Sequence, residues 1–286
     1  MGNRARNYLG PGMDIEASAL DKYEATGRYI AGVKVDGMWA DTVVGNPSEG
    51  RPNVLSSRDA STGPVLDDRK GDLDRIQLPW PGDTIIVGEL EAATEWATEE
   101  VARRGYRRMH VFDVVAVGGK CVKGLTWEQR RELLTMMYRS KADVIMDRFP
   151  VIEPHATGFR ALYDQAVADG HEGVVLWDRT ATYSASRGDG KADTVIRCKR
   201  HFTKDYVLFS LGRTPSGVLT GEWGLYKNGK LSRTMQASCP PEFLRQENVG
   251  RLVVEFKGAK LFKSGAFRHA SYVRVRTDKP AEQCTL

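Results

Sequence analysis

Short apolar runs alternate with helical patterns over the first two thirds of the chain. Runs rich in β-branched and aromatic residues, which are typical of buried strands, occupy residues 29–35, 54–56, 84–90, 109–115, 173–177 and 194–199. Helical patterns occupy residues 14–23, 95–108, 126–142 and 159–168. Thr126 and Gln129 have the spacing of a capping box, which marks the start of a helix. The alternation predicts an α+β region.

The helical pattern nearly disappears beyond residue 202. Strand-like runs follow one another at residues 206–209, 219–226, 231–236, 252–256 and 272–276, with one short helix near residues 241–246. Asn228-Gly229, between two of these runs, is a strong hairpin signal. Five strands in about 80 residues fit an all-β barrel of the OB type, which binds oligonucleotides. We therefore divide the chain into residues 1–202 and residues 203–286.

Charge is distributed unevenly between the two parts of the chain. Residues 1–196 carry 25 Lys and Arg against 30 Asp and Glu, whereas residues 197–286 carry 17 against 7. The last third is therefore strongly basic, although the whole chain has a net charge of only +5. A basic module predicts contact with a polyanion such as nucleic acid. Basic surfaces also serve solubility, so charge by itself does not identify the partner.

The composition argues against membrane and secreted proteins. No run of about 18 apolar residues is present, and no apolar signal core follows the basic N-terminus. The cysteines lie far apart, without the spacing of a zinc site, at Cys121, Cys198, Cys239 and Cys284. We expect reduced thiols in a cytoplasmic, monomeric protein that does not bind a membrane.

Charged side chains stand at the ends of the predicted strands. In chain order these positions are Lys34 with Asp36, Glu89, Asp113 beside Phe112, Glu172, and Arg197 with Lys199. A lysine at the end of a buried strand is costly to keep charged, and a neutral amine is a nucleophile. Carboxylates suit a hard divalent cation, and several cations suit phosphates. Each residue alone has an ordinary explanation as a strand end, but the joint order predicts a site for a nucleoside triphosphate.

The same positions carry an ordered series of motifs. The series is Lys34-Val35-Asp36-Gly37, Ser57-Arg58, Gly88-Glu89-Leu90, Val111-Phe112-Asp113, Glu172-Gly173-Val174-Val175, Arg197-Cys198-Lys199 and a basic tail ending in Arg276-Thr277-Asp278-Lys279. In this order the motifs resemble those of the ATP-dependent DNA ligases, which share a superfamily of covalent nucleotidyltransferases with RNA ligases and mRNA capping enzymes. The resemblance covers nearly the whole chain. It implies an α+β nucleotidyltransferase domain, ATP-grasp-like with antiparallel sheets and helices, followed by an all-β OB-fold barrel.

The resemblance also implies a role for each motif. The implied catalytic residues are Lys34, Asp36, Lys199 and Lys279. Residues implied to contact the nucleotide or its phosphates are Val33, Arg58, Glu89, Phe112, Arg197, Arg276 and Asp278. Glu172 is expected to hold Mg²⁺ or Mn²⁺, and Glu89 to bind the ribose or assist the metal.

Within this scheme, AMP is transferred from ATP to the lysine amine and then to DNA. Phe112 stacks on the purine, and Arg58 grips the 5′-phosphate of a nick. Arg197 and Lys199 neutralise the α-phosphate, and residues 276–279 orient the pyrophosphate. The 3′-hydroxyl finally displaces AMP and closes the nick.

Three positions depart from the ligase pattern. Trp39 stands where the lysine motif usually ends in arginine, and tryptophan cannot make the charged contacts of arginine. Gly32 replaces a glutamate that often contacts adenine in ligases. Arg197 replaces the first lysine of the Lys-x-Lys motif and presents a planar fork of donors. Trp39 and Gly32 leave open an RNA ligase or an mRNA-capping-type guanylyltransferase.

We predict an ATP-dependent DNA ligase that seals 3′-OH/5′-phosphate nicks in duplex DNA through lysyl-AMP and DNA-adenylate. The expected partner is nicked duplex DNA, the cofactors are ATP and Mg²⁺ or Mn²⁺, and the process is DNA repair, replication or recombination. A non-catalytic OB protein that binds nucleic acid is the alternative from another class. Such a protein does not need Lys34, Glu89, Glu172 and Lys279 together.

Overall fold

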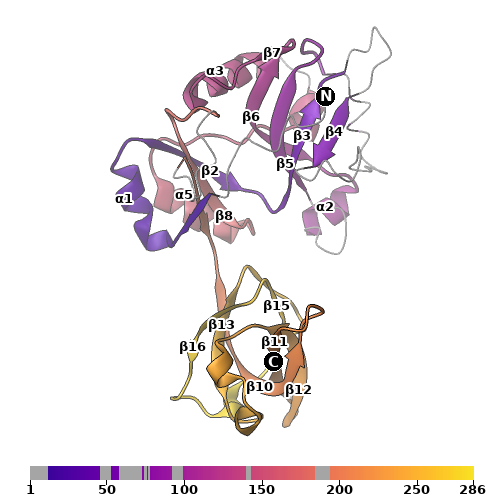
Figure 1. Ribbon diagram of the computed structural model, residues 1–286. Coiled ribbons are helices and arrows are strands. Elements are labelled where there is room, and N and C mark those ends of the chain that lie inside the picture. Colours follow the sequence, from indigo (N-terminus) through magenta and orange to yellow (C-terminus); the bar gives the residue numbers. More distant parts are fainter. Residues whose placement is uncertain are drawn as a thin grey trace. The chain divides into compact units, whose positions relative to one another are not determined.

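The computed structural model describes residues 12–45, 53–57, 73, 76, 78–91, 99–139, 143–183 and 194–286. The chain divides into two compact units, Met1–Lys199 and Arg200–Leu286 (Figure 1). This division falls close to the boundary predicted after residue 202. None of the helices in the described ranges is long and apolar enough to cross a bilayer.

The first sheet of unit 1 joins strands that are far apart in the sequence. Its order is β1 (Met13–Ile15), β9 (Val195–Lys199), β8 (Gly173–Asp178) and β2 (Tyr29–Lys34). β1 runs parallel to β9, and the other pairs are antiparallel. One face of this sheet packs against helices α1 (Leu20–Glu24) and α5 (Phe159–Ala168) in a shared apolar core. Because side chains alternate along a strand, Lys34 lies on the opposite face.

The second sheet of unit 1 is antiparallel throughout. Its order is β4 (Val54–Ser57), β3 (Gly37–Val43), β5 (Ile85–Glu91), β6 (Met109–Val117) and β7 (Lys120–Cys121). Helix α3 (Trp127–Tyr138) packs on β6, and the capping box at its start is confirmed by hydrogen bonds of 3.0 and 3.2 Å between Thr126 and Gln129. The remaining helices of this unit are α2 (Glu99–Arg104) and α4 (Asp143–Arg148).

The two sheets of unit 1 are joined both covalently and by packing. Val35 and Asp36 connect β2 of the first sheet directly to β3 of the second. Ile30 and Val195 from the first sheet pack in one apolar cluster with Val87 of the second. The Lys34 face of the first sheet is therefore turned toward the second sheet.

Unit 2 is an OB-like antiparallel sheet. The strand order is β12 (Lys230–Ala237), β11 (Leu219–Lys227), β10 (Phe202–Arg213), β13 (Val253–Gly258) and β16 (Ser271–Val275). A small antiparallel pair, β14 (Lys260–Leu261) and β15 (Phe267–Arg268), also belongs to this unit, and β15 is labelled in Figure 1. Asn228 and Gly229 have φ of 51° and 74°, as the hairpin signal predicts. The unit encloses its own core around Tyr206, Trp223 and Phe256.

The sequence pattern was wrong about three segments. Residues 14–23 were predicted to be one helix, but Met13–Ile15 form β1 and only Leu20–Glu24 are α-helical. The sequence pattern did not predict β3, which begins at Gly37. The pattern of β3 is obscured because it buries Asp41 and Thr42 as well as apolar residues. The short helix near residues 241–246 consists of two 3₁₀ turns.

Candidate active site

The ends of three neighbouring strands align Lys34, Gly173 and Lys199. Lys34 on β2 pairs with Gly173 on β8, and Gly173 pairs with Lys199 on β9. Two strand spacings place the Cα atoms of the two lysines roughly 10 Å apart. The backbone N–H of Glu172 donates to the carbonyl of Lys34 at 3.1 Å, which fixes the start of β8 beside the lysine.

Gly173 allows this alignment. Its φ of +137° lies in a region that residues with a side chain rarely adopt. A Cβ at this position would lie 2.1 Å from the carbonyl oxygen of Cys198. The Glu-Gly motif therefore needs glycine because the backbones of β8 and β9 approach each other closely there.

Lys34 forms an ion pair with Glu172. The two side chains are only 17% and 19% exposed, so the pair is largely shielded from solvent. Glu172 Oε2 is buried, and apart from this ion pair it has no hydrogen-bond partner among the described residues. The amine predicted to be the nucleophile is therefore in direct contact with the carboxylate predicted to hold the metal.

Lys199 and Arg197 extend this set of charges along β9. The pKa of Lys199 is lowered first by burial and then by the positive charges of Lys34 and Arg197. Arg197 is held by Asp14, with its Nε 2.8 Å from Oδ1 and its Nη2 3.1 Å from Oδ2. This contact follows from the parallel register of β1 and β9, in which Asp14 pairs with Arg197. The charged row is defined here as Asp14, Arg197, Lys199, Glu172 and Lys34.

Glu89 lies on the second sheet, beside the turn that follows Lys34. It pairs across the strands with Trp39, and a Cβ at Gly37 would lie 3.0 Å from its Cγ. Glu89 is half-buried, as are Asp36 and Trp39. Trp39 therefore neighbours a predicted ligand residue at the position where ligases carry arginine.

Phe112 also lies on the side of the second sheet that faces the first. A β-bulge interrupts the pairing of β5 with β6 between Val87 and Gly88, opposite Phe112. The Phe112 ring is 91% buried and stacks on Trp177 of β8 at a centroid distance of 6.1 Å.

A Cβ at Gly32 would lie 2.6 Å from the Trp177 ring. Trp177 therefore fills the space of a side chain at residue 32, which explains the glycine there.

A buried ion pair fixes β6 behind Phe112. Arg130 of α3 donates to both oxygens of Asp113 at 2.9 and 3.0 Å, and the Tyr183 hydroxyl donates at 2.7 Å. Asp113 and Arg130 are 2% and 3% exposed. The aspartate of the Phe-Asp motif thus has a structural role in this protein.

The tail residues of unit 2 form a separate cluster of charges. Arg276 Nη1 donates to both oxygens of Asp205 at 3.1 and 2.9 Å, and Lys279 Nζ donates to the same carboxylate at 2.8 Å. Asp278 binds the other edge of the Arg276 guanidinium, with distances of 2.9 Å to Nε and 2.9 Å to Nη2. We call these four residues the Asp205 cluster.

The structure brings together some of the predicted site residues and separates others. Lys34, Glu172, Arg197 and Lys199 share one face of the first sheet, with the side chains of Glu89 and Phe112 on the facing sheet. The Val33 side chain packs on the opposite face of the first sheet, so only its backbone faces the site. Arg58 lies outside the described residues. Arg276, Asp278 and Lys279 belong to unit 2.

Sequence reasoning missed the anionic partners of the predicted cations. Asp14 was placed in a helix, and Asp205 lies among ordinary strand residues. No local pattern identifies either residue, because each acts through a partner 71 or more positions away.

Among the described residues, this site offers a metal ion only one or two carboxylate ligands. The described residues contain no group of three or more His, Cys, Asp or Glu side chains that could enclose a metal. Mg²⁺ usually takes one or two carboxylates together with substrate phosphates. The Oε2 of Glu172 suits that arrangement because it is buried and, apart from the ion pair with Lys34, has no hydrogen-bond partner among the described residues.

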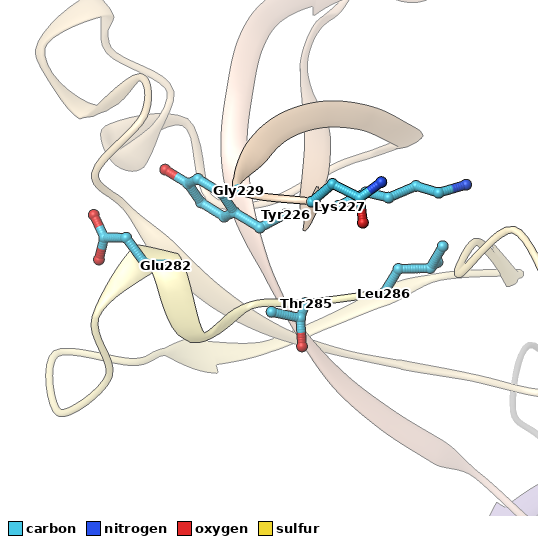
Figure 2. Close-up of a pocket in the computed structure, with 7 residues that line it drawn as sticks. Tyr226, Lys227, Gly229, Glu282, Thr285 and Leu286 are labelled. Atoms are coloured by element: carbon cyan, nitrogen blue, oxygen red, sulfur yellow. The ribbon is translucent and has the colours of Figure 1, made fainter.

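A pocket of about 410 Å³ opens in unit 2, between the β11–β12 hairpin and the last residues of the chain. Figure 2 shows Tyr226 and Lys227 on one side and Glu282, Thr285 and Leu286 on the other. None of the predicted site residues lines it.

Comparison with known proteins confirms the resemblance to ATP-dependent DNA ligases. The family described as "ATP dependent DNA ligase domain" matches residues 86–191, a range that contains Glu89, Phe112 and Glu172. Lys34 and Lys199 lie outside this range. No curated protein matches the sequence.

Solved structures with the same fold include several DNA ligases. One titled "Pmar-Lig_PreS3" has a TM-score of 0.65 at 15% identity and covers 94% of this chain and 68% of its own. A structure from a study of minimal Lig E DNA ligases has a TM-score of 0.59 at 17% identity, and the match covers 94% of this chain and 99% of the Lig E chain. The ligase domain of LigD from M. tuberculosis has a TM-score of 0.50 at 15% identity, and the match covers 99% of this chain and 100% of the LigD domain. At these identities the matches establish the fold, a nucleotidyltransferase with an OB-like unit.

Proposed function

We propose that this protein is an ATP-dependent DNA ligase that seals nicks between a 3′-hydroxyl and a 5′-phosphate in duplex DNA. The observation that carries the proposal is the shielded contact between Lys34 and Glu172, with Lys199 aligned beyond Gly173. It combines an amine, a carboxylate and a second cation, which nucleotidyl transfer to lysine requires.

In the first step the Lys34 amine attacks the α-phosphorus of ATP. The amine leaves its ion pair with Glu172 and loses a proton, a P–N bond forms, and the bond from the α-phosphorus to pyrophosphate breaks. Arg197 and Lys199 neutralise charge that develops on the α-phosphate. Asp36 and Glu89 flank the turn beside the lysine, where the ribose is bound, and Phe112 stacks on the purine.

In the following steps AMP leaves the lysine and then leaves the DNA. An oxygen of the 5′-phosphate attacks the AMP phosphorus, and the P–N bond to Lys34 breaks as the amine regains a proton. The 3′-hydroxyl then attacks the 5′-phosphorus and releases its proton to solvent, and AMP departs as the phosphodiester forms. We assign the grip on the 5′-phosphate to Arg58 and the orientation of pyrophosphate in the first step to Arg276, Asp278 and Lys279.

Glu172, assisted by Glu89, would hold Mg²⁺ or Mn²⁺. The metal would supply charge neutralisation at the phosphates and favour the release of pyrophosphate.

Three features support DNA as the substrate. The family matched by residues 86–191 is that of ATP-dependent DNA ligases, and structures with a TM-score of 0.50 or more include DNA ligases. Residues 197–286 are strongly basic, with 17 Lys and Arg against 7 Asp and Glu. A basic module of this fold suits duplex DNA, and its binding should weaken steeply with salt.

An RNA ligase or a guanylyltransferase is the second candidate, because Trp39 and Gly32 depart from the DNA ligase pattern. Trp177 covers Gly32, so no side chain of residue 32 can recognise the base. Comparing ATP with GTP as label donor, and then nicked DNA with RNA ends as substrate, separates this candidate from the first.

The deciding experiment is labelling of the protein with ATP that carries ³²P at the α-phosphate, in the presence of Mg²⁺. We expect a labelled band that survives denaturation and is reduced at least about 10³-fold in Lys34→Ala, because the nucleophile is lost. Lys120→Ala is the matched control, since Lys120 is also a terminal residue of a strand in unit 1 but is exposed and outside the charged row. Labelling of Lys34→Ala at the wild-type level would reject the proposed site.

A further inference from the structure

We infer that Asp205 is a positioning residue that holds Arg276 and Lys279 in the arrangement in which they meet the pyrophosphate of ATP. The inference rests on the proposed function and adds to it a residue outside all of the recognised motifs. One carboxylate contacts both cations of the tail, with donor distances of 2.8 to 3.1 Å.

The strand register places Asp205 beneath the tail. Asp205 lies on β10 next to Tyr206, which is fully buried in the core of unit 2. Side-chain alternation therefore turns Asp205 to the other face of β10. The backbone N–H of Arg276 donates to the carbonyl of Val253 on the neighbouring strand β13 at 2.8 Å. Because β13 pairs with β10, the arginine leaves the sheet one strand away from the strand that carries its carboxylate partner.

The two carboxylates that contact Arg276 differ in exposure, and this difference identifies the anchor. The Asp205 side chain is 9% exposed, whereas that of Asp278 is 66% exposed. An ion pair with an exposed carboxylate contributes little because solvent screens it, but a buried carboxylate depends on its cationic partners. Asp205 is therefore the residue whose loss displaces the tail.

The cluster leaves both cations able to bind a phosphate. An ammonium has three N–H donors and a guanidinium has five, and the contacts with Asp205 and Asp278 use only part of them. The Arg276 and Lys279 side chains are 20% and 25% exposed. Asp205 thus fixes the two cations without covering them.

The test separates orientation of pyrophosphate from general stability, because only the first of the three chemical steps releases pyrophosphate. In Asp205→Asn we expect the rate of labelling with ATP to fall about 100-fold, the loss typical of a misplaced reactive group. Sealing of a nick that already carries AMP on its 5′-phosphate should stay within about threefold of wild type.

A matched control and a second variant keep the outcome decisive. Glu222→Gln removes another carboxylate of unit 2, one that binds Arg233 at 2.9 Å, and should leave both rates unchanged. If thermal unfolding shows that Asp205→Asn does not fold, Asp205→Glu keeps the charge but moves it by one methylene, and should still slow labelling more than sealing.

The outcomes distinguish this inference from the proposed function. Equal loss of labelling and sealing in the folded variant, or labelling at the wild-type rate, would overturn the positioning role alone. A wild-type protein that takes no label from ATP would overturn the proposed function and the inference with it.

Discussion

Lys34 in unit 1 and Lys279 in unit 2 are each held by a carboxylate, but the charges around them are balanced differently. The charged row contains three cations, Lys34, Arg197 and Lys199, and two carboxylates, Glu172 and Asp14. In the Asp205 cluster, Arg276 and Lys279 are matched by Asp205 and Asp278. The first group has a surplus of positive charge, and the second is neutral.

The difference predicts that the two units affect different steps, binding of the triphosphate and its cleavage. Surplus positive charge attracts a phosphate, and it adds to the effect of burial, which is the main cause of the lowered pKa of Lys199. A neutral cluster attracts phosphate weakly, but its cations are fixed by short hydrogen bonds. Unit 1 should therefore dominate the affinity for the triphosphate, whereas unit 2 should affect mainly the rate of its cleavage.

The largest expected effect comes from Gly173→Ala, which breaks the alignment of the charged row. The new Cβ would lie 2.1 Å from the Cys198 carbonyl at a φ of +137°. We expect unfolding to become easier by about 3 kcal/mol or more, with loss of ATP labelling. Urea unfolding and labelling measure the two effects.

Gly217→Ala is the matched control for this prediction. Gly217 has a φ of +84°, but no atom lies within 4 Å of its Cβ position. Its substitution should cost only about 1 kcal/mol. Equal losses of stability in the two variants would show that the close approach of β8 and β9 is unimportant.

The next effect tests where the surplus charge acts. Lys199→Met should reduce labelling about 10²- to 10³-fold, because it removes the donor that the proposed mechanism assigns to the α-phosphate. Arg197→Met should reduce labelling less than Lys199→Met does, since Asp14 already neutralises part of the arginine charge. Single-turnover labelling rates at saturating ATP make the comparison, and a larger loss in Arg197→Met would reverse the assignment.

These predictions also show how far the sequence leads. The ordered motifs correctly predicted the fold and the resemblance to DNA ligases, because most of them lie in or next to a strand with a clear local pattern. The strand of Lys34 and the strand of Lys199 were both recognisable as apolar runs. The register that aligns the two lysines was not, since it depends on pairing between distant segments.

The partners of the cations could not be predicted for the same reason. β1 has only three residues and pairs in parallel with a strand about 180 positions later, so Asp14 carries no signal of its own. The bond between Arg276 and Asp205 likewise spans 71 positions. Gly32 was noticed as a departure, but its cause is the Trp177 ring on a neighbouring strand.

Asp41 extends the comparison to a buried carboxylate that lacks a cation among the described residues. It is 5% exposed on β3, and its Oδ1 has no hydrogen-bond partner there. Burial raises the pKa of Asp41 from 3.8 to about 6, despite a hydrogen bond with Ser56. The folded protein therefore binds this proton more tightly than the unfolded chain, so stability falls as the pH rises from about 4 to about 6.

Asp41→Asn should accordingly stabilise the protein at pH 7 by about 1–3 kcal/mol, with the difference vanishing below about pH 4. Urea unfolding at both pH values measures it. Asp164→Asn, at a side chain 62% exposed, is the control and should change little at either pH. A gain of the same size at pH 4 and pH 7 would rule out titration of Asp41 as the cause.

The smallest expected effect comes from Asp14→Asn, which increases the surplus charge of the row. Asp14 is 50% exposed, so its ion pair with Arg197 should contribute no more than about 1 kcal/mol, and labelling at pH 7 should change less than about fivefold. Asp14 also raises the pKa of Lys199, so its removal should lower that pKa further. The decline of labelling at high pH should then begin at a lower pH than in the wild type.

The labelling rate between pH 7 and pH 10 measures this shift, and an alkaline decline at the wild-type pH would contradict it. Set beside Asp205→Asn, the result sharpens the contrast between the units. In the charged row, where cations are in surplus, loss of a carboxylate should shift the pKa of Lys199 and leave the labelling rate at pH 7 nearly unchanged. In the Asp205 cluster, where charges are balanced, loss of a carboxylate should leave the cations misplaced. Only the rate of the first step, the labelling with ATP, should then fall.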